Sequence, residues 1–219
     1  MAKTIDNFNF LKHTMLPVKS DGDTYWRVML IARRKPGENE DLPVGSKIYG
    51  YFTVECQHDL EDLEGMIKKA AEDNNARAYM DTNPKSWKKT AFNTLKRITQ
   101  CVTDGAYKTC VTAAERAMDD SCIKDHKSYL IDFDFNDDPA MNRETELAIY
   151  EILISIGSWI KFMVPTQHGQ HYIVQPFYVD LFRKLWEERC KTNELLQKNV
   201  PDILKRGLTI LYHKPQDQK

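Results

Sequence analysis

The segment Tyr129-Leu130-Ile131-Asp132-Phe133-Asp134-Phe135 combines the apolar residues of a strand with two acids that stand two positions apart. Side chains of a strand alternate between its two faces, so Leu130, Asp132 and Asp134 share one face. The opposite face is apolar and belongs against a core. Two carboxylates roughly 6 to 7 Å apart on a strand repel by a few kcal/mol at an effective dielectric near 20. The acidic face therefore calls for water, a cationic partner or a divalent metal ion.

A second polar segment, Thr166-Gln167-His168-Gly169-Gln170-His171, follows about thirty residues later and leads into the strand expected at 172–174. A histidine can donate to phosphate oxygens, and a glycine leaves room for a polyanion to approach the backbone. An acidic strand alone is a common solvated surface. The histidine segment turns it into a candidate site, provided that the two segments meet in space.

Composition restricts the class of protein. The 219 residues favour one elaborated domain, and 31 basic against 32 acidic residues leave no global field that attracts nucleic acid. Any polyanion site must be a local patch. Five cysteines without a CxxC pair and the lack of an apolar leader indicate a reduced, cytoplasmic setting. No apolar run is long enough to cross a bilayer, so no membrane partner is expected.

The periodicity of apolar residues alternates between strand-like and helix-like segments. Strands are predicted at 25–32, 47–55, 77–81, 129–135, 159–164, 172–174 and 208–212. Helices are predicted at 59–71, from Asn83-Pro84 to Val102, at 107–118, 146–156 and 181–190. This order predicts an α+β fold, with a mixed sheet flanked by helices. We expect a loosely packed lead-in over 1–24, a single domain over 25–213 and a frayed tail over 214–219.

The acidic strand resembles the first catalytic motif, hydrophobic-Asp-hydrophobic-Asp, of the archaeo-eukaryotic primase superfamily. The segment from Pro165 to Val174 is similar to the second motif, in which a small residue, any residue and a histidine enter a strand. The match spans about a quarter of the chain, from Tyr129 to Phe177, and is closest to the small phage- or plasmid-type members. It implies an RRM-like primase-polymerase core.

The resemblance also implies a function. Asp132 and Asp134 would hold Mg²⁺ or Mn²⁺, and His171, with Thr166 and Gly169, would contact the triphosphate of an incoming nucleotide. Oxygen ligands suit these ions, and a metal-assisted displacement suits nucleotidyl transfer. The expected activity transfers nucleotides from a nucleoside triphosphate onto a nucleic-acid strand. Expected partners are nucleoside triphosphates, a single-stranded DNA or RNA template and, as a further class, other replication proteins.

The sequence departs from the family at the third metal-binding acid, which the family carries on a later strand. Asp180 stands where a helix begins, and Asp202 stands a few residues before the strand at 208–212, so neither has the expected strand context. Two alternatives follow. The chain could be a catalytically degenerate protein of the same fold that only binds nucleic acid or nucleotide, or a metal-dependent nuclease that uses the same acids on water.

A basic segment around Asn83-Pro84 is the candidate for template binding. Backbone N–H groups at a helix N-terminus favour phosphate, and cationic side chains contact nucleic-acid backbones. The four residues expected to make such contacts are Arg77, Lys85, Lys88 and Lys89. The alternative is an ordinary solvated helix start with capping residues.

Overall fold

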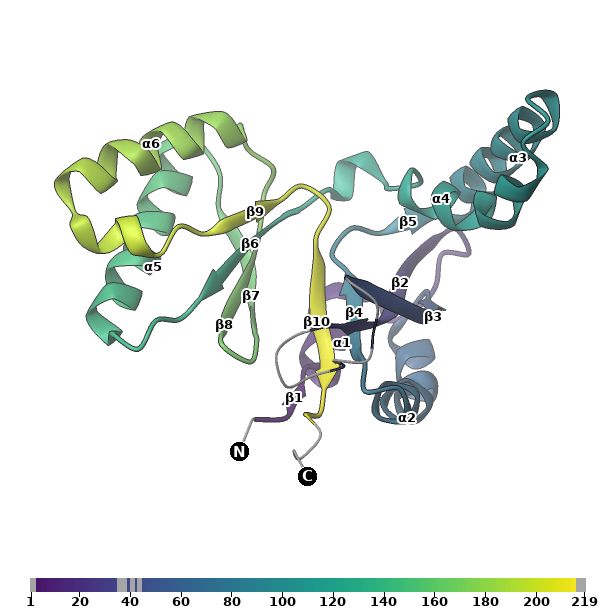
Figure 1. Cartoon of the computed structure of the whole chain (residues 1–219), viewed down its shortest axis with the longest axis horizontal. Helices are drawn as coiled ribbons and strands as arrows, with labels where there is room; N and C mark the ends of the chain where they lie inside the picture. Colours follow the sequence, from purple (N-terminus) through teal and green to yellow (C-terminus); the bar gives the residue numbers. More distant parts are fainter. Residues whose placement is uncertain (1–2, 35–38, 40–41, 43–44, 216–219) are drawn as a thin grey trace.

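Two antiparallel sheets form the framework of the protein (Figure 1). The structure is a computed structural model that describes residues 3–34, 39, 42 and 45–215. The first sheet has the order β1-β10-β4-β2-β3, with β5 paired to β2. Its strands are β1 (Ile5–Asp6), β2 (Thr24–Arg33), β3 (Ser46–Val54), β4 (Arg77–Asp81), β5 (Lys85–Ser86) and β10 (Leu208–His213). The last strand, β10, thus lies between β1 and β4, inside a sheet that otherwise consists of N-terminal strands.

The second sheet has the order β7-β8-β6-β9. Its elements are β6 (Tyr129–Asp134), α5 (Pro139–Ser155), β7 (Ile160–Pro165), β8 (Gly169–Val174), α6 (Val179–Thr192) and β9 (Asp202–Leu204). The chain therefore runs β-α-β-β-α-β, and both central strands have antiparallel neighbours, which is the ferredoxin-like arrangement. A short 3₁₀ helix, η3 (Glu194–Lys198), precedes β9.

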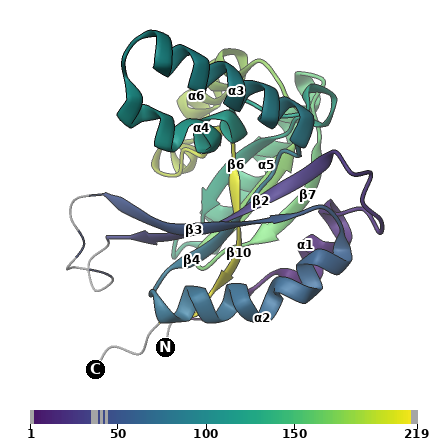
Figure 2. The same ribbon diagram turned by 90° about the vertical axis from the view of Figure 1, so that its right-hand side faces the viewer.

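Helices cover one face of each sheet. The helices α1 (Phe8–Met15) and α2 (Gln57–Asp73) pack beneath the first sheet, where Phe8, Leu11 and Ile67 enter its core (Figure 2). On the second sheet, α5 and α6 pack over Ile131 and Phe133 of β6. The other face of β6 contributes Leu130 to the core of the first sheet. The two sheets therefore share a core, and the alternation predicted for the acidic strand is confirmed.

The structure confirms an α+β fold and corrects several details. The predicted mixed sheet is wrong, because every pairing among the described strands is antiparallel and the strands form two sheets. The expectation of a loose lead-in over 1–24 is wrong for the described residues 3–24, since α1 packs in the core and β1 pairs with β10. In the tail, Lys214 forms an ion pair with Glu72, and residues 216–219 lie outside the described residues.

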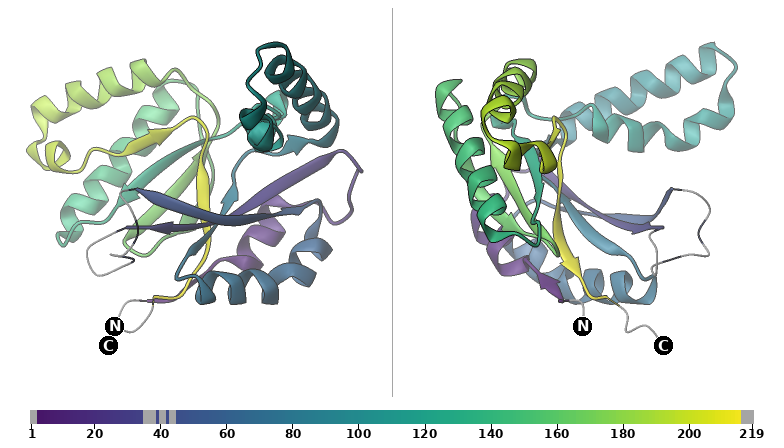
Figure 3. Two further views of the ribbon diagram at one scale, coloured as in Figure 1. Left: turned by 45° about the vertical axis from the view of Figure 1, so that its right-hand side comes forward. Right: turned by 60° about the vertical axis from the view of Figure 1, so that its left-hand side comes forward.

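A helical arm projects from the first sheet (Figure 3). It consists of α3 (Trp87–Thr103), η1 (Tyr107–Thr112) and α4 (Ala113–Asp119). The expected start of α3 at Asn83-Pro84 is wrong, because Ser86 is the N-cap and accepts a hydrogen bond from the Lys89 N–H at 3.1 Å. Asn83 is engaged elsewhere, where its side chain bonds both backbone groups of Ser128 just before β6.

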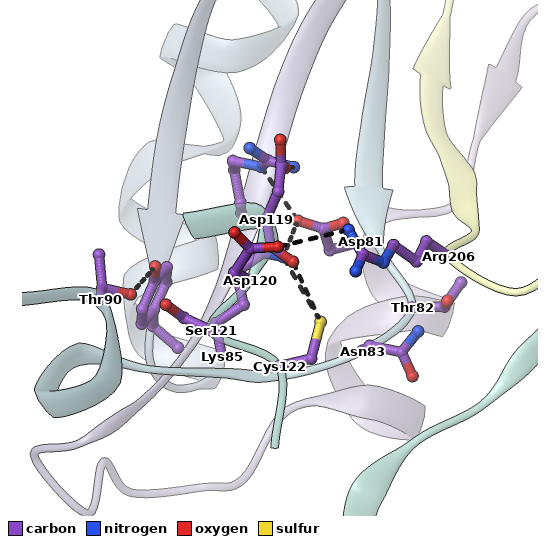
Figure 4. Close-up of polar contacts among 12 residues, drawn as sticks. Asp81, Thr82, Asn83, Lys85, Thr90, Asp119, Asp120, Ser121, Cys122 and Arg206 are labelled. Carbon is purple, nitrogen blue, oxygen red and sulfur yellow. Dashed lines mark hydrogen bonds and ion pairs between the residues drawn. The ribbon is translucent and has the colours of Figure 1, made fainter. Parts of the chain in front are cut away.

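A buried ionic network fixes the base of the arm to the first sheet (Figure 4). Arg27 of β2 donates to Asp81 of β4 at 3.0 Å and to Asp119 at the end of α4 at 2.8 Å. The Lys85 ammonium lies 3.3 Å from the same Asp81 carboxylate. Burial raises the pKa of Asp81, although Lys85 and Arg27 oppose that shift. Burying these charges costs desolvation energy. Removal of one of them destabilises the protein, because it leaves a buried charge without its partner.

We predict that Arg27→Ala lowers the free energy of unfolding by about 3 to 5 kcal/mol, because it leaves Asp81 buried beside a single cation. Urea denaturation followed by circular dichroism measures the change. The matched control is Lys69→Ala, which removes an exposed ion pair with Asp73 on α2 and should leave the midpoint unchanged. Equal midpoints for the two variants would contradict a stabilising role for the network.

Gly169 gives a second prediction. A Cβ atom at this position would lie 1.9 Å from the carbonyl oxygen of Phe133, whereas a Cβ at Gly65 in α2 meets nothing within 4 Å. Gly169→Ala should therefore cost about 1 to 3 kcal/mol or more, since the two strands must separate. Gly65→Ala should stabilise the protein by about 0.5 to 1 kcal/mol through helix propensity. Thermal and urea unfolding of both variants would test the pair, and a neutral Gly169→Ala would refute the close approach.

Candidate functional site

The centre of the candidate site is Asp132, which lies between two polar residues of neighbouring strands. In the register of the second sheet, Asp132 is directly opposite His171 of β8 and directly opposite Asp202 of β9. Cross-strand neighbours have Cβ atoms about 4.5 to 5.5 Å apart. Asp134 follows on the same face of β6, opposite Gly169. The structure therefore brings together the two acids and the histidine that the sequence predicted, and it adds Asp202.

Asp202 corrects the sequence analysis. It is the first residue of β9 and pairs with β6, so it has the strand context that the sequence alone did not reveal. The sequence feature that could have indicated this strand is Ile203-Leu204, two aliphatic residues directly after Asp202. By contrast, Asp180 lies in the first turn of α6. Its side chain is exposed and its neighbour is Arg183 of the same helix.

His171 links the two sheets at the site. Its Nε2 atom lies 3.4 Å from the Asp132 carboxylate, and its Nδ1 atom lies 3.1 Å from the hydroxyl of Thr209 on β10. Thr209 is completely buried, and His171 is 8% exposed to solvent. A hydroxyl can donate or accept, so Thr209 can satisfy Nδ1 in either tautomer, whereas the carboxylate of Asp132 only accepts and pairs with an Nε2–H. The ring is thereby oriented with one nitrogen toward the acids.

A polar cavity of about 400 Å³ opens over these residues. Both sheets and the β7–β8 turn contribute to its walls. The polar and aromatic residues that line it are Arg33, Arg77, Tyr79, Asp132, Asp134, Thr166, Gln167, His168, His171 and Asp202. Three carboxylates from the second sheet thus share one cavity with two guanidinium groups from the first.

The basic wall of the cavity comes from the first sheet. Arg77 of β4 is predominantly buried, and Arg33 at the end of β2 lies with its guanidinium 5.1 Å from the ring centre of Tyr79. The ring face holds the cation in place. Sequence reasoning missed Arg33, because Arg33-Arg34 looks like a solvated turn when the strand pairing is unknown. Two cations opposite three carboxylates create a site that can hold a metal-bound polyanion.

The β7–β8 turn forms the mouth of the cavity. The Thr166 hydroxyl accepts a hydrogen bond from the Gly169 N–H at 3.0 Å, which closes the turn. The side-chain oxygen of Gln167 is buried beside it and has no hydrogen-bond partner among the described residues. Packing explains why position 169 is a glycine, since the backbone of β6 fills the space that a side chain would occupy. That space is not open to a polyanion.

The four cations expected to bind template do not form one patch. Arg77 lies in the cavity, whereas Lys88 and Lys89 lie on the arm, and the Lys89 ammonium approaches the carbonyl of Cys122. Lys85 is 2% exposed and ion-paired with Asp81, so the expectation that it contacts a nucleic-acid backbone is wrong. Its burial follows from the pairing of β5 with β2.

The donor set agrees with a hard divalent cation. Asp132, Asp134 and Asp202 supply only carboxylate oxygens, which Mg²⁺ and Mn²⁺ prefer. Within the described part of the chain, no three acidic, histidine or cysteine side chains converge closely enough to hold an ion as they stand. Small rotations of exposed carboxylates would be needed, and the side chain of Asp132 is 37% exposed.

Across residues 3–34, 39, 42 and 45–215, no helix has the length and apolar character that a membrane crossing requires. Searches against protein-family models, curated proteins and solved structures find no match to this chain.

Proposed function

We propose that the chain is a primase-polymerase-like nucleotidyltransferase, which uses a divalent metal to add nucleotides from triphosphates to a nucleic-acid strand. The observation that carries the proposal is the alignment of Asp202, Asp132 and His171 across three adjacent strands, with Asp134 on the same face. A third acid on a later strand was the part of the primase pattern that the sequence left unfilled. We infer that Asp202, which pairs with Asp132 across β6 and β9, is this third acid.

The topology of the second sheet supports the same proposal. The order β9-β6-β8-β7 with two helices on one face is also that of RRM-like domains. In this arrangement the two catalytic motifs fall on the two central strands, β6 and β8. The proposed core thus comprises residues 129–204, and the first sheet supplies the opposite wall of the cavity.

Each residue has a role that follows from its chemistry. Bound divalent ions would activate a 3′-hydroxyl and neutralise the departing pyrophosphate, and Asp132, Asp134 and Asp202 would hold them. His171 would donate from Nε2 to a phosphate oxygen while Thr209 fixes its ring. Arg33 and Arg77 would bind the triphosphate with charge-assisted hydrogen bonds.

The alternatives from the sequence now differ in their support. A degenerate binding protein was motivated by the missing third acid, and Asp202 is now a candidate for that acid, which favours the enzymatic proposal. A metal-dependent nuclease would use the same acids to activate water, and no separate feature of the structure favours it. Both alternatives are outcomes of the experiment below.

We predict that Asp132→Asn, Asp134→Asn and Asp202→Asn each reduce Mn²⁺-dependent incorporation of labelled nucleotides on a primed or unprimed single-stranded template. The expected loss is at least about 100-fold, because even residues that only hydrogen-bond to the ligands of a metal contribute about 10 to 100-fold. The control is Asp137→Asn, an exposed acid just beyond β6 that does not line the cavity.

The outcomes of this assay separate the candidates. If the Asp202→Asn variant incorporates nucleotides as well as the wild type does, the three-acid site is refuted. Nucleotide and template binding without any incorporation would identify a binding protein. Cleavage of the labelled template, lost in the same variants, would identify a nuclease.

We further predict that Arg33→Ala weakens binding of a fluorescent nucleoside triphosphate at least tenfold, which corresponds to about 1.4 kcal/mol. The matched control is Arg34→Ala, because Arg34 is exposed, adjacent in sequence and does not line the cavity. Fluorescence anisotropy in the presence of Mn²⁺ at two salt concentrations measures both. An equal loss in the two variants would show that net charge, rather than the cavity, determines affinity.

A further inference from the structure

The outer face of the helical arm carries an apolar surface that the protein itself does not cover. The arm extends away from both sheets in Figure 3. Among the 17 residues of α3, only Thr90 is buried. Phe92, Leu95, Ile98 and Val102 are 67%, 65%, 39% and 53% exposed, respectively. We call these four residues the arm stripe.

The spacing of the arm stripe places its members on one side of the helix. Leu95, Ile98 and Val102 follow the i, i+3, i+7 pattern of an amphipathic face, and Phe92 lies one turn before Leu95. A helix of a globular protein normally turns such a face toward a core. Contiguous exposed apolar surface of this kind marks an interaction site.

The inner face of α3 is polar, and polar contacts hold it in this orientation. Thr90 shares a 2.8 Å hydrogen bond with the Tyr25 hydroxyl, and Asn93 donates to Ser121 at 3.3 Å. Arg97 forms an ion pair with Asp120 beyond α4. The helix is therefore fixed with its polar side toward the protein and its apolar side toward solvent.

The charges of α3 indicate what kind of partner fits. The helix contains Lys88, Lys89, Lys96 and Arg97, and no acidic residue between positions 87 and 103. Lys88 and Lys96 are exposed and lie beside the arm stripe. A partner that matches this surface presents apolar side chains flanked by carboxylates.

Two other occupants fit less well. A second copy packed antiparallel about the middle of α3 would place Lys96 of one copy next to Lys96 of the other, with no acid in the helix to offset the repulsion. Single-stranded nucleic acid binds by stacking on aromatic rings. The arm stripe has one aromatic residue, Phe92, among aliphatic side chains.

We propose that the arm stripe is the docking site for an acidic amphipathic segment of a partner protein, which lies along α3 as a helix against a helix. Its aliphatic side chains would cover Leu95, Ile98 and Val102, and its acids would pair with Lys88 and Lys96. The arm stripe is separate from the polar cavity that both sheets line. It stands whether or not the chain transfers nucleotides.

The test uses a synthetic peptide as the probe. The peptide has about 18 residues, with leucine at helical i, i+3, i+4, i+7 spacing and glutamate at the solvent-facing positions; a second peptide replaces glutamate with lysine. Fluorescence anisotropy with the full chain should show binding of the acidic peptide that weakens with salt. The lysine peptide should bind at least tenfold more weakly.

Two double variants with the same i, i+7 spacing locate the binding. Leu95→Gln with Val102→Gln should weaken the acidic peptide at least tenfold. Leu147→Gln with Ile154→Gln, on the exposed face of α5, is the matched control, with side chains 50% and 71% exposed, and should leave binding unchanged. All four substituted side chains are exposed, so melting temperatures should match that of the wild type.

Several results would overturn the proposal. The proposal is refuted if both peptides bind equally well, or if the acidic peptide does not bind at about 100-fold excess over the protein. It is also refuted if the two double variants lose the same amount of peptide affinity. A dimer in sedimentation that Leu95→Gln with Val102→Gln abolishes would assign the arm stripe to a second copy. Loss of oligonucleotide binding in that same variant would assign it to nucleic acid.

Discussion

The antiparallel register of β6 between β8 and β9 is the constraint on which the candidate site depends. Asp132 meets His171 on one side and Asp202 on the other only in this register. A shift by one residue would turn every side chain of β6 to the opposite face and bring Ile131 and Phe133 into the polar cavity. Gly169 limits the register, because its α-carbon approaches the Phe133 carbonyl so closely that no side chain fits. Packing therefore fixes the positions of the polar groups.

Electrostatics explains why such a site is unlike an ordinary strand surface. Unit charges of the same sign about 5 Å apart repel by roughly 3 kcal/mol at an effective dielectric of 20. Asp132, Asp134 and Asp202 line one cavity, and the first sheet adds Arg33 and Arg77 to its walls. A protein selected for stability alone would separate these acids. Local conflict of this kind is typical of functional sites, where a ligand or ion completes the charge balance.

Sequence patterns predicted the parts of the fold that local periodicity determines. The strand at 77–81, the helix beginning near Asp59 and the alternation around Asp132 all depend on residues within one segment, and the structure has them. Asp202 was considered as the third acid, but its strand context was not predicted, because β9 has three residues and its strand character comes from pairing with β6 rather than from propensity. The division into two sheets and the packing of α1 are also set by contacts between distant segments, which no local pattern contains.

Two features of the arm and its base differ from what the local sequence suggests. A lysine next to a helix start is typical of a solvated cation, and an apolar helix face is typical of a core face, yet Lys85 is buried and the arm stripe is exposed. The ionic network of Arg27, Asp81 and Asp119 accounts for the burial of Lys85, since it draws β5 into the first sheet, and it also anchors the end of α4. Such networks cost desolvation energy and add little stability compared with apolar contacts of the same volume. What this one supplies is position, because it ties β5 and the end of α4 to the first sheet. The contacts of Thr90, Asn93 and Arg97 then hold α3 with its polar face inward. That orientation leaves the apolar face available to a partner.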